Sequence, residues 1–283
     1  MGLLVALPGS AQAAVLPVPL GTADSFVVLA GETVTNTGAT TLNGSIGVTP
    51  GSSITGQETL TVNGETHVAD TVAAAAKVDF GTAYDNAAGQ TPATAIPTEL
   101  GGSTLKPGLY SGGTFGLTNT LTLDADGDPT AMFVFQSAAT LITASDSRVL
   151  LIDGANPCNV FWQVSTSATL GSGSSFTGTI LASNSVSLAT GATVQGRAFA
   201  STGSVTLQGN TITKPVCVGA PAPTPTATPT AQVTAVPTGA VSTGDGSTSG
   251  GGNNGLGLLA GVLVFAGFTG VTFVAVRRRR LNV

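Results

Sequence analysis

Charged residues, aromatic residues, histidine and cysteine are all scarce in this 283-residue sequence. Asp, Glu, Lys and Arg make up 8% of the chain, whereas typical globular proteins contain about 25%. Four of the nine basic residues are adjacent, at Arg277, Arg278, Arg279 and Arg280. The remainder has no basic stripe of the kind that nucleic-acid-binding proteins carry. The composition therefore excludes a nucleic-acid partner.

The shortage of ionisable side chains also limits catalysis. His67 is the single histidine. A Ser-His-Asp triad would depend on it, yet no Gly-x-Ser-x-Gly turn lies near it. One histidine and two cysteines do not make a convincing zinc site. We interpret His67 as a surface residue at the start of a helix, and we expect neither a metal nor a cofactor.

A degenerate repeat organises residues 121–217. One coil of this kind cannot bury its own Leu and Val, so coils must stack around a common core. Alternation then turns Leu and Val inward and Thr and Ser outward. We predict a mostly β fold, a β-solenoid. The Leu-to-Leu steps are 18, 29, 18 and 19 residues in these segments: Leu121-Thr122-Leu123, Ala139-Thr140-Leu141, Ala168-Thr169-Leu170, Val186-Ser187-Leu188 and Val205-Thr206-Leu207.

The outward positions of this repeat form two predicted rows of hydroxyl groups. Thr and Ser suit exposed strands in general, so an ordinary solvated surface is one interpretation. The other is a flat, regular array that orders water into an ice-like layer. The first row comprises Thr35, Thr122, Thr140, Thr169, Ser187 and Thr206, and the second comprises Ser175, Thr193, Thr211 and Thr40.

Residues 24–48 are predicted to be a detached coil of the same solenoid. Residues 26–30 parallel residues 178–182, and residues 37–40 repeat residues 190–193 letter for letter. Such a coil must rejoin its relatives in space, because unpaired strand edges would otherwise be exposed. Between the two parts, apolar residues at steps of three and four predict one flanking helix over residues 66–88, with Thr66 or Asn63 as its cap and Gly89 just past its end.

The remaining charged residues do not form a catalytic cluster. Enzymes that act on polysaccharides need carboxylates or basic groups gathered on one face. Between residues 121 and 217 the basic residues are Arg148, Arg197 and Lys214, while Asp146 and Asp153 lie in or near turns. The repeat places no pair of these on one outward row. We therefore predict a non-enzymatic domain, with a polysaccharide-acting enzyme as the least favoured alternative.

An alternating acidic run resembles a calcium loop only in part. Asp124, Asp126 and Asp128 begin the run, but an EF-hand loop needs Gly at its sixth position and Glu at its twelfth. Here Gly127 is fourth and Phe135 is twelfth. A solvated turn is favoured, with a weak calcium site as the alternative.

Signals for export and anchoring flank the solenoid. Residues 1–13 (MGLLVALPGSAQA) resemble the end of a secretory signal. Residues 218–254 are a linker that is rich first in Pro and Thr and then in Gly and Ser. Residues 255–276 are uncharged and long enough to span a membrane, and the basic tail 277–283 predicts a cytoplasmic C-terminus. Anchoring to a cell wall is the alternative, although residues 236–239 lack part of the required L-P-x-T-G sequence.

The two cysteines, Cys158 and Cys217, are either buried free thiols or a disulfide. An exported protein favours the disulfide, which would close the last coil onto the insertion in the repeat.

Several stretches together resemble the microbial ice-binding (antifreeze) protein family with a discontinuous β-solenoid. They are residues 40–48 (TTLNGSIGV), 107–110 (PGLY), 133–136 (FVFQ), 158–163 (CNVFWQ), 190–194 (TGATV) and 196–198 (GRA). The resemblance covers about residues 20–217. It implies a right-handed β-helix of about six coils with a triangular section, one long helix on its flank, and the N-terminal coil packed beside the C-terminal one.

The same resemblance implies ice binding through one flat face, without metal or cofactor. Some members carry T-A/G-x-T/N tetrads on that face. Residues 37–40 and 190–193 match this tetrad, residues 172–175 and 143–146 match it in part, and residues 123–126 depart from it. The candidate ice-binding set is therefore the two rows above together with Thr37 and Thr190.

We hypothesise a cell-surface protein whose domain, residues 14–217, adsorbs to ice while a stalk and a membrane helix hold it at the cell. The expected partners are ice and the membrane, and the ectodomain is expected to be monomeric. The alternative is a surface adhesin that binds glycans or neighbouring cells, for which a groove with aromatic and carboxamide side chains would be needed.

Overall fold

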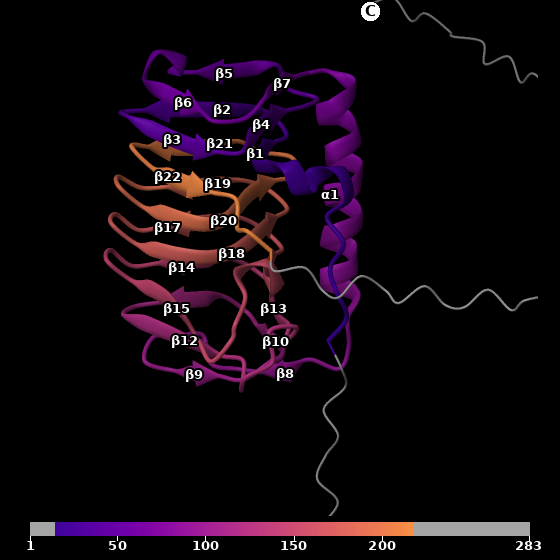
Figure 1. Cartoon of the computed structure of the whole chain (residues 1–283), viewed down its shortest axis with the longest axis vertical. Coiled ribbons are helices and arrows are strands. Elements are labelled where there is room, and N and C mark those ends of the chain that lie inside the picture. The colour runs from indigo at the N-terminus through magenta and orange to yellow at the C-terminus, as the bar shows by residue number, and fades with distance from the viewer. Residues whose placement is uncertain (1–14, 218–283) are drawn as a thin grey trace, which may run out of the picture. The chain divides into compact units, whose positions relative to one another are not determined.

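The computed structural model describes residues 15–217, which form a mostly β unit of parallel strands with one long α-helix (Figure 1). The strands belong to one sheet of 15 strands and one of seven strands. The larger sheet bends around a corner of the molecule, so the coils have three faces. Within residues 15–217, this confirms the predicted mostly β fold with parallel sheets and a single α-helix.

One face, here called the helix face, lies against the helix. Its strands are β1 (Phe26–Ala30), β4 (Ser45–Val48), β7 (Thr66–Val68), β8 (Thr94–Ala95), β10 (Gly108–Gly112), β13 (Phe133–Ser137), β16 (Val160–Val164), and the second halves of β18 (Ser175–Ala182) and β20 (Thr193–Ala200).

The seven-stranded sheet forms the next face, here called the hydroxyl face. Its strands are β11 (Phe115–Leu117), β14 (Leu141–Thr143), β17 (Ala168–Leu170), β19 (Val186–Leu188), β21 (Val205–Gln208), β2 (Thr33–Thr37) and β5 (Ser53–Thr55), in that order. The third face comprises β9 (Thr104–Leu105), β12 (Thr120–Asp124), β15 (Arg148–Ile152), β22 (Thr211–Thr213), β3 (Thr40–Asn43), β6 (Leu60–Val62) and the first halves of β18 and β20.

Two stacked glycines let β18 and β20 cross from the third face to the helix face. Gly178 and Gly196 are partners in the register of these strands. Gly178 has a φ of 115°, which side-chain-bearing residues rarely adopt. A Cβ atom on Gly196 would lie 1.9 Å from the carbonyl oxygen of Gly178. Only glycine therefore allows the two backbones to approach at this bend.

The N-terminal coil stacks directly on the C-terminal coil, although about 170 residues separate them in sequence. Strand β1 pairs in parallel with β20 (Val28 opposite Ala198), β2 pairs with β21, and β3 pairs with β22. Through β20, Val28 also aligns with Ile180, as the parallel between residues 26–30 and 178–182 predicts. The discontinuous arrangement is therefore confirmed. The hydroxyl face has seven strands, one from each coil. The number of coils is therefore seven, where the resemblance implied about six.

The α-helix α1 (Thr71–Gly89) begins later than the sequence predicts. Residues 66–68 form strand β7, and Asp70 is the N-cap, whose carboxylate accepts a hydrogen bond from the Ala73 amide at 2.7 Å. Gly89 is the last helical residue and not the one that follows. The hydrophobic spacing located the helix, but a short strand at its N-terminus carries similar residues.

The buried stripe of α1 packs on the helix face. Ala76, Phe80, Ala83 and Ala87 are buried, and they join a core that is separate from the core inside the coils. The strand residues in this second core are Phe26, Leu29, Leu109, Val134, Phe161, Leu181 and Phe199. The helix thus covers one face and carries the chain from the β7 end of the stack to the β8 end (Figure 1). The hydroxyl face and the third face stay uncovered by it.

His67 lies in strand β7 and not on a surface helix as predicted. Its ring packs at 5.4 Å from the ring of Phe26. Nδ1 lies 2.8 Å from Oδ2 of Asp70, and Nε2 lies 3.1 Å from Oε2 of Glu65. The histidine therefore supports the N-terminus of α1.

Removal of the helix cap is expected to lower the thermal unfolding midpoint. The Ala73 amide, followed by His67, holds the pKa of Asp70 below its ordinary value of 3.8. A lowered pKa stabilises the fold above pH 3.8, and this stabilisation is lost as the pH falls further. Asp70→Ala should therefore unfold at a lower temperature than the unsubstituted chain at pH 7, with a smaller difference at pH 3, when both are followed by circular dichroism.

The matched control for this substitution is Asp85→Ala, because Asp85 is exposed on the same helix. An equal loss from both substitutions would contradict the capping role of Asp70.

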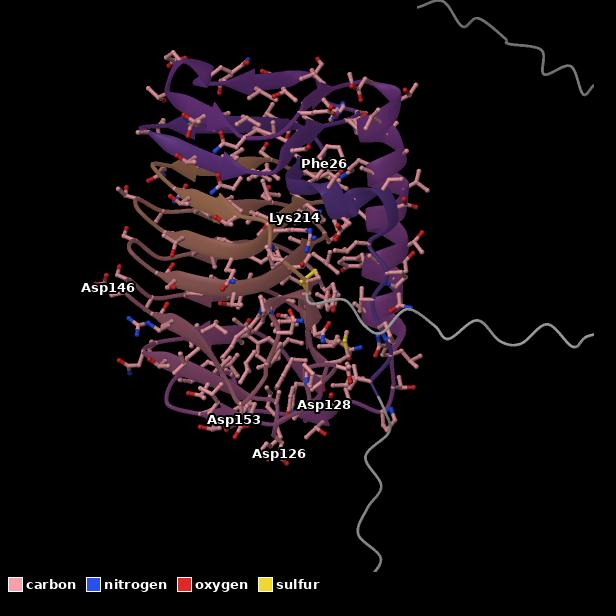
Figure 2. The ribbon with its side chains drawn as sticks, viewed as in Figure 1. Phe26, Asp126, Asp128, Asp146, Asp153 and Lys214 are labelled. Carbon is pink, nitrogen blue, oxygen red and sulfur yellow. A yellow bond between two sulfur atoms is a disulfide. The ribbon has the colours of Figure 1, made fainter. Side chains whose placement is uncertain are left out.

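Two sets of contacts fix the ends of the described chain. Arg197 is 1% exposed, and its guanidinium contacts Oδ1 of Asp24 at 2.5 Å, while Lys214 contacts Oδ2 of the same carboxylate at 2.8 Å. Asp24 belongs to the 3-10 helix η1 (Gly21–Ser25). A disulfide joins Cys158, in the 3-10 helix η3 (Pro157–Asn159), to Cys217 (Figure 2).

The predicted signal (1–13), linker (218–254), membrane helix (255–276) and basic tail (277–283) lie outside the described residues. Within residues 15–217, no helix has the length and the apolar character that crossing a membrane requires.

Candidate functional site

The hydroxyl face carries a ladder of hydroxyl groups at one register position. The paired residues, here called the first ladder, are Thr55, Thr35, Thr206, Ser187 and Thr169, and Ile142 and Gly116 continue the position on β14 and β11. Among the described residues, none of the five hydroxyl groups has a protein hydrogen-bond partner. Each hydroxyl therefore keeps one donor and two acceptor sites for water.

A second ladder runs beside the first, two residues earlier in every strand. It comprises Ser53, Thr33, Ser204, Ser185, Ser167, Thr140 and Thr114. These hydroxyl groups partly bond to one another: Thr33 donates to Ser204 at 2.8 Å, and Thr140 donates to Thr114 at 3.4 Å. The amides of Ser204 and Ser185 donate to Ser185 and Ser167, respectively. The second ladder is consequently held in fixed positions.

Apolar residues between the two ladders fix their register. Val34, Val205, Val186, Ala168, Leu141 and Phe115 point into the core and are at most 1% exposed. Burial of each Val, Leu or Phe side chain contributes roughly 1.5–3 kcal/mol. A slip of one residue would turn these side chains outward and the hydroxyl groups inward. Core burial therefore keeps the register of the face regular.

Charge is confined to the rim of the hydroxyl face. The outward positions of both ladders contain no ionisable side chain. Glu32 reaches Ser204 from the preceding turn, at 3.4 Å. Glu99 forms an isolated β-bridge with Gly116 at the β11 end of the face. The amides of Thr118 and Gly101 donate hydrogen bonds to the Glu99 carboxylate and hold its pKa below the ordinary value. The centre of the face is therefore neutral at any ordinary pH.

The third face also has hydroxyl residues, but its array is mixed. Thr61, Thr41, Thr211, Thr193 and Ser175 are in register, and Arg148 takes the next position. The neighbouring position holds Asn63, Asn43, Thr213 and Gln195, and on β15 the exposed Leu150. Beyond them, Lys106 contacts Asp124 at 2.9 Å and Asp126 at 3.0 Å. Charge and carboxamides thus interrupt this face.

The structure places four residues of the first predicted row in one ladder and the other two elsewhere. Thr35, Thr206, Ser187 and Thr169 share the first ladder. Thr140 belongs to the second ladder, because its neighbour Leu141 pairs with Ala168. Thr122 lies on the third face, opposite Thr104 and Leu150.

The misplacement of Thr122 has a local cause. In the coil that contains Thr122, residues 115–117 occupy the seven-stranded sheet, and Leu121-Thr122-Leu123 belongs to the strand that follows.

The second predicted row lies on the third face. Ser175, Thr193 and Thr211 are in register, but the next partner is Thr41 and not Thr40. Thr40 is 1% exposed, and its hydroxyl accepts a hydrogen bond from the Asn210 amide at 3.1 Å. Thr40 is therefore not available at the surface.

The identical tetrads of residues 37–40 and 190–193 are out of register with each other by one residue. Thr35 aligns with Ser187 through β21, and Thr41 aligns with Thr193 through β22. Residues 37–40 therefore stack near residues 189–192 and not on 190–193. Thr37 and Thr190 are both exposed, at the corner between the hydroxyl face and the third face.

The sequence predictions missed most of the second ladder and one member of the first. These residues are Ser53, Thr33, Ser204, Ser185, Ser167, Thr114 and, in the first ladder, Thr55. The signal was the triplet hydroxyl–apolar–hydroxyl, which recurs as Ser53-Ile54-Thr55, Thr33-Val34-Thr35, Ser204-Val205-Thr206, Ser185-Val186-Ser187 and Ser167-Ala168-Thr169. An alignment on the leucine alone hides the first residue of each triplet.

The acidic run is a turn held by an ion pair. Lys106 bridges the carboxylates of Asp124 and Asp126, which lowers the pKa of Asp124 and raises that of Lys106. In residues 15–217, no group of three or more His, Cys, Asp or Glu side chains is placed to hold a metal ion. Asp146 lies at a different corner from Asp126, Asp128 and Asp153 (Figure 2).

The fold and the hydroxyl face together define a class: a β-solenoid whose discontinuous coils present a neutral array of hydroxyl groups in regular register. Comparison with known proteins gives the family. Residues 28–213 match the model of the ice-binding-like family. The chain belongs to this family.

Relatives and solved structures share both sequence and fold with this chain. An ice-binding protein of Nostoc sp. (strain HG1) is 49% identical over 196 residues, which are 68% of this chain and 72% of the relative. A crystal structure of an ice-binding protein from an Antarctic biological consortium has 43% identity and a TM-score of 0.71, and covers 74% of this chain and 96% of its own. The ice-binding protein of Antarctomyces psychrotrophicus has 40% identity and a TM-score of 0.68, over 70% and 98% of the two chains.

Proposed function

We propose that this protein adsorbs to ice through its hydroxyl face. The observation that carries the proposal is the first ladder, five hydroxyl groups in register that have no hydrogen-bond partner within residues 15–217, beside a second and partly hydrogen-bonded ladder. The named relatives are ice-binding proteins, and this face is the flat, neutral surface that such binding needs.

The strand spacing is close to a repeat of ice. An O–H···O hydrogen bond spans about 2.75 Å, so second neighbours in a tetrahedral lattice lie about 4.5 Å apart. Stacked strands are about 4.8 Å apart, which leaves a difference of about 0.3 Å per strand. Over the four intervals of the first ladder the mismatch reaches about 1.2 Å, less than half of one lattice repeat. With the lattice aligned on the middle strand, the ladder deviates from lattice positions by about 0.6 Å at either end.

Neutrality is the second requirement. Ionised side chains bind water strongly in their own geometry and are costly to bring into contact with another solid phase. Thr methyl groups instead present small apolar areas between the hydroxyl groups. The third face fails on this criterion because it includes Arg148 and the Lys106–Asp124 pair. The hydroxyl face is for this reason the proposed site.

The proposal includes the setting of the protein. We propose a non-enzymatic, monomeric domain that needs no cofactor or metal, is exported, and is tethered by residues 218–276, with residues 277–283 in the cytoplasm; a wall anchor is the less favoured tether. Held in this way, the domain would attach cells to ice or shape ice at the envelope. Support comes from the uncharged segment 255–276 and the following arginines in the sequence.

A groove favours one second candidate, an adhesin for neutral glycans. It lies between α1 and the helix face, has a volume of about 300 Å³, and is lined in part by Tyr84, Gln136 and Gln163. The Gln163 amide donates to the Tyr84 hydroxyl at 2.8 Å. Aromatic and carboxamide groups are those that glycan recognition uses. However, Gln136 also donates to the carbonyls of Ala87 and Gln90, so part of this set holds the helix end.

Ice-affinity partitioning of residues 14–217 tests the proposal. We expect the domain to concentrate in a slowly growing ice phase, while a protein of similar size without a hydroxyl ladder stays in the liquid. A domain that stays in the liquid contradicts ice binding. If that domain then binds neutral glycan beads, and Tyr84→Ala removes this binding, the adhesin is the correct function.

A further inference from the structure

The last described strand occupies a sensitive place in the stack. Strand β22 has three residues and lies between β20 of the C-terminal coil and β3 of the N-terminal coil. The sequence continues beyond Cys217, so tension applied from that side reaches β22 first. Peeling of β22 would separate the two coils on the third face, one of the three faces on which they pair.

The disulfide offers this tension a second path. Cys217 is bonded to Cys158 across a sequence separation of 59 residues, and Cys158 lies two residues before β16. Every residue of β16 is buried, and this strand pairs with both β13 and β18. Force that enters at Cys217 is therefore shared between a three-residue strand and a buried five-residue strand inside the stack.

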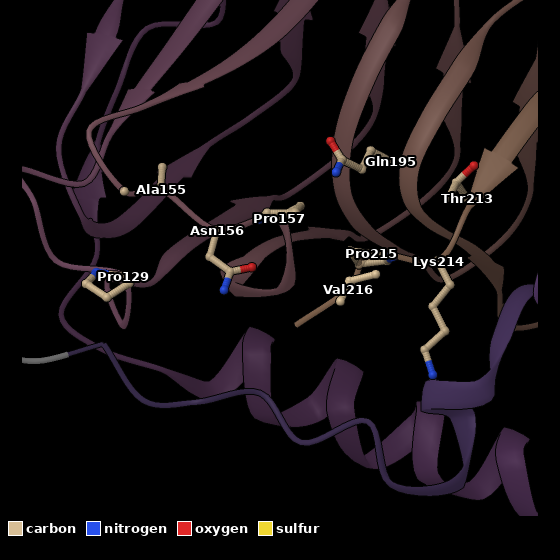
Figure 3. A pocket seen from close by; sticks show the side chains of 10 residues that line it. Pro129, Ala155, Asn156, Pro157, Gln195, Thr213, Lys214, Pro215 and Val216 are labelled. Atoms are coloured by element: carbon tan, nitrogen blue, oxygen red, sulfur yellow. The ribbon is translucent and has the colours of Figure 1, made fainter. Parts of the chain in front are cut away.

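Noncovalent packing near the bridge is incomplete. A cavity of about 310 Å³ separates residues 213–216 from the loop of residues 154–157 (Figure 3). Val216 is 89% exposed. Nearby, Nζ of Lys214 lies 2.8 Å from Oδ2 of Asp24. Both side chains of this ion pair are accessible to solvent, and such pairs contribute little to stability. The covalent bond is thus the strong connection between the C-terminal segment and the loop.

The closed loop contains much of the proposed ice-binding face. Residues 158–217 include β17, β19 and β21, and with them Thr169, Ser187 and Thr206 of the first ladder. While the disulfide is intact, tension along the backbone cannot extend residues 158–217, because the bridge closes them into a loop.

We propose that Cys158 and Cys217 are positioning residues that keep the hydroxyl face assembled when the protein is pulled from its C-terminal side. The physiological purpose of this clamp rests on the proposed function, in which adsorbed ice and a tether pull in opposite directions. The clamp itself is a property of the fold and is measurable without ice.

Optical-tweezers unfolding of the full chain, with handles at its two ends, tests the clamp. In the oxidised chain, the unfolded contour should be shorter by 59 residues, about 200 Å at roughly 3.4 Å per residue. This difference verifies that the bridge is intact. The decisive measurement is the force of the first opening event, which should fall to roughly half when the bridge is removed, because rupture then needs only the peeling of β22.

Two independent routes remove the bridge, namely reduction of the unsubstituted chain and the double substitution Cys158→Ser, Cys217→Ser. An unchanged first-opening force in either folded form would overturn the proposal. Ice partitioning of the same samples without load separates the two hypotheses. Equal partitioning of the oxidised and the reduced chain supports a role under load alone. Weaker adsorption of the reduced chain without load would contradict that role. If neither form enters ice, ice binding fails while the force result still stands.

Discussion

Thr206→Tyr is expected to abolish the adsorption of this protein to ice. Thr206 lies at the middle of the first ladder, between Thr35 and Ser187. A phenol ring there would stand above the plane of the neighbouring hydroxyl groups and hold an ice surface away from several strands at once. We expect the fraction of protein that partitions into ice to fall by at least about tenfold, which corresponds to about 1.4 kcal/mol of adsorption free energy.

The fold should tolerate this substitution. Thr206 points outward from a strand, and tyrosine is favourable on exposed strand surfaces. Its neighbours Val205 and Leu207 supply the core packing of β21 and are unchanged. Circular dichroism should therefore give the same unfolding midpoint for the variant and the unsubstituted chain, and a loss of partitioning can then be assigned to the surface.

Thr193→Tyr is the matched control. Thr193 is likewise a threonine of a central strand, exposed where Thr206 is partly exposed, but it lies on the third face, between Ser175 and Thr211. We expect this variant to partition into ice as the unsubstituted chain does. The reverse result, in which Thr193→Tyr loses adsorption and Thr206→Tyr keeps it, would assign ice binding to the third face.

The repeat and the alternation of apolar residues were sufficient to predict the coils, because burial imposes them locally. The parallel between residues 26–30 and 178–182 even gave the correct register of the detached coil, since both segments are buried on two sides. The start of α1 was not predictable from spacing alone. Residues 66–68 are compatible with either a strand or a helix, and pairing with β4 decides for the strand.

The placement of some residues differed from the sequence prediction at the corner between the hydroxyl face and the third face. Thr35 to Thr41 and Ser187 to Thr193 both take six residues around this corner, but Thr37 follows its ladder residue by two positions and Thr190 follows its own by three. Identical letters around the corner therefore do not stack. Polar residues also line the inside of this corner: Thr40 and Asn210 are buried there and hydrogen bonded to each other. Sequence pattern does not distinguish these from surface hydroxyl groups.

Asp24→Ala is expected to have the largest effect on stability, about 3 kcal/mol, because it leaves a buried charge without its partner. Arg197 is 1% exposed, and burial lowers its pKa while Asp24 acts in the opposite direction. After the substitution, the backbone carbonyl of residue 24 still accepts hydrogen bonds from Nε and Nη2 of Arg197. Among the described residues, no other carboxylate is paired with the guanidinium to balance its charge. Urea unfolding followed by circular dichroism measures this loss.

Two further variants show whether the buried charge is the cause. Lys214→Ala removes the other, half-exposed partner of Asp24 and should cost less than about 1 kcal/mol. The double variant Asp24→Ala, Arg197→Met should recover much of the loss, since it removes the unpaired charge and keeps an apolar side chain of similar length. If the double variant is less stable than Asp24→Ala alone, the guanidinium stabilises the junction through its carbonyl and Thr179 contacts. The pairing of the N-terminal coil with the C-terminal coil would then depend on those hydrogen bonds and not on charge balance.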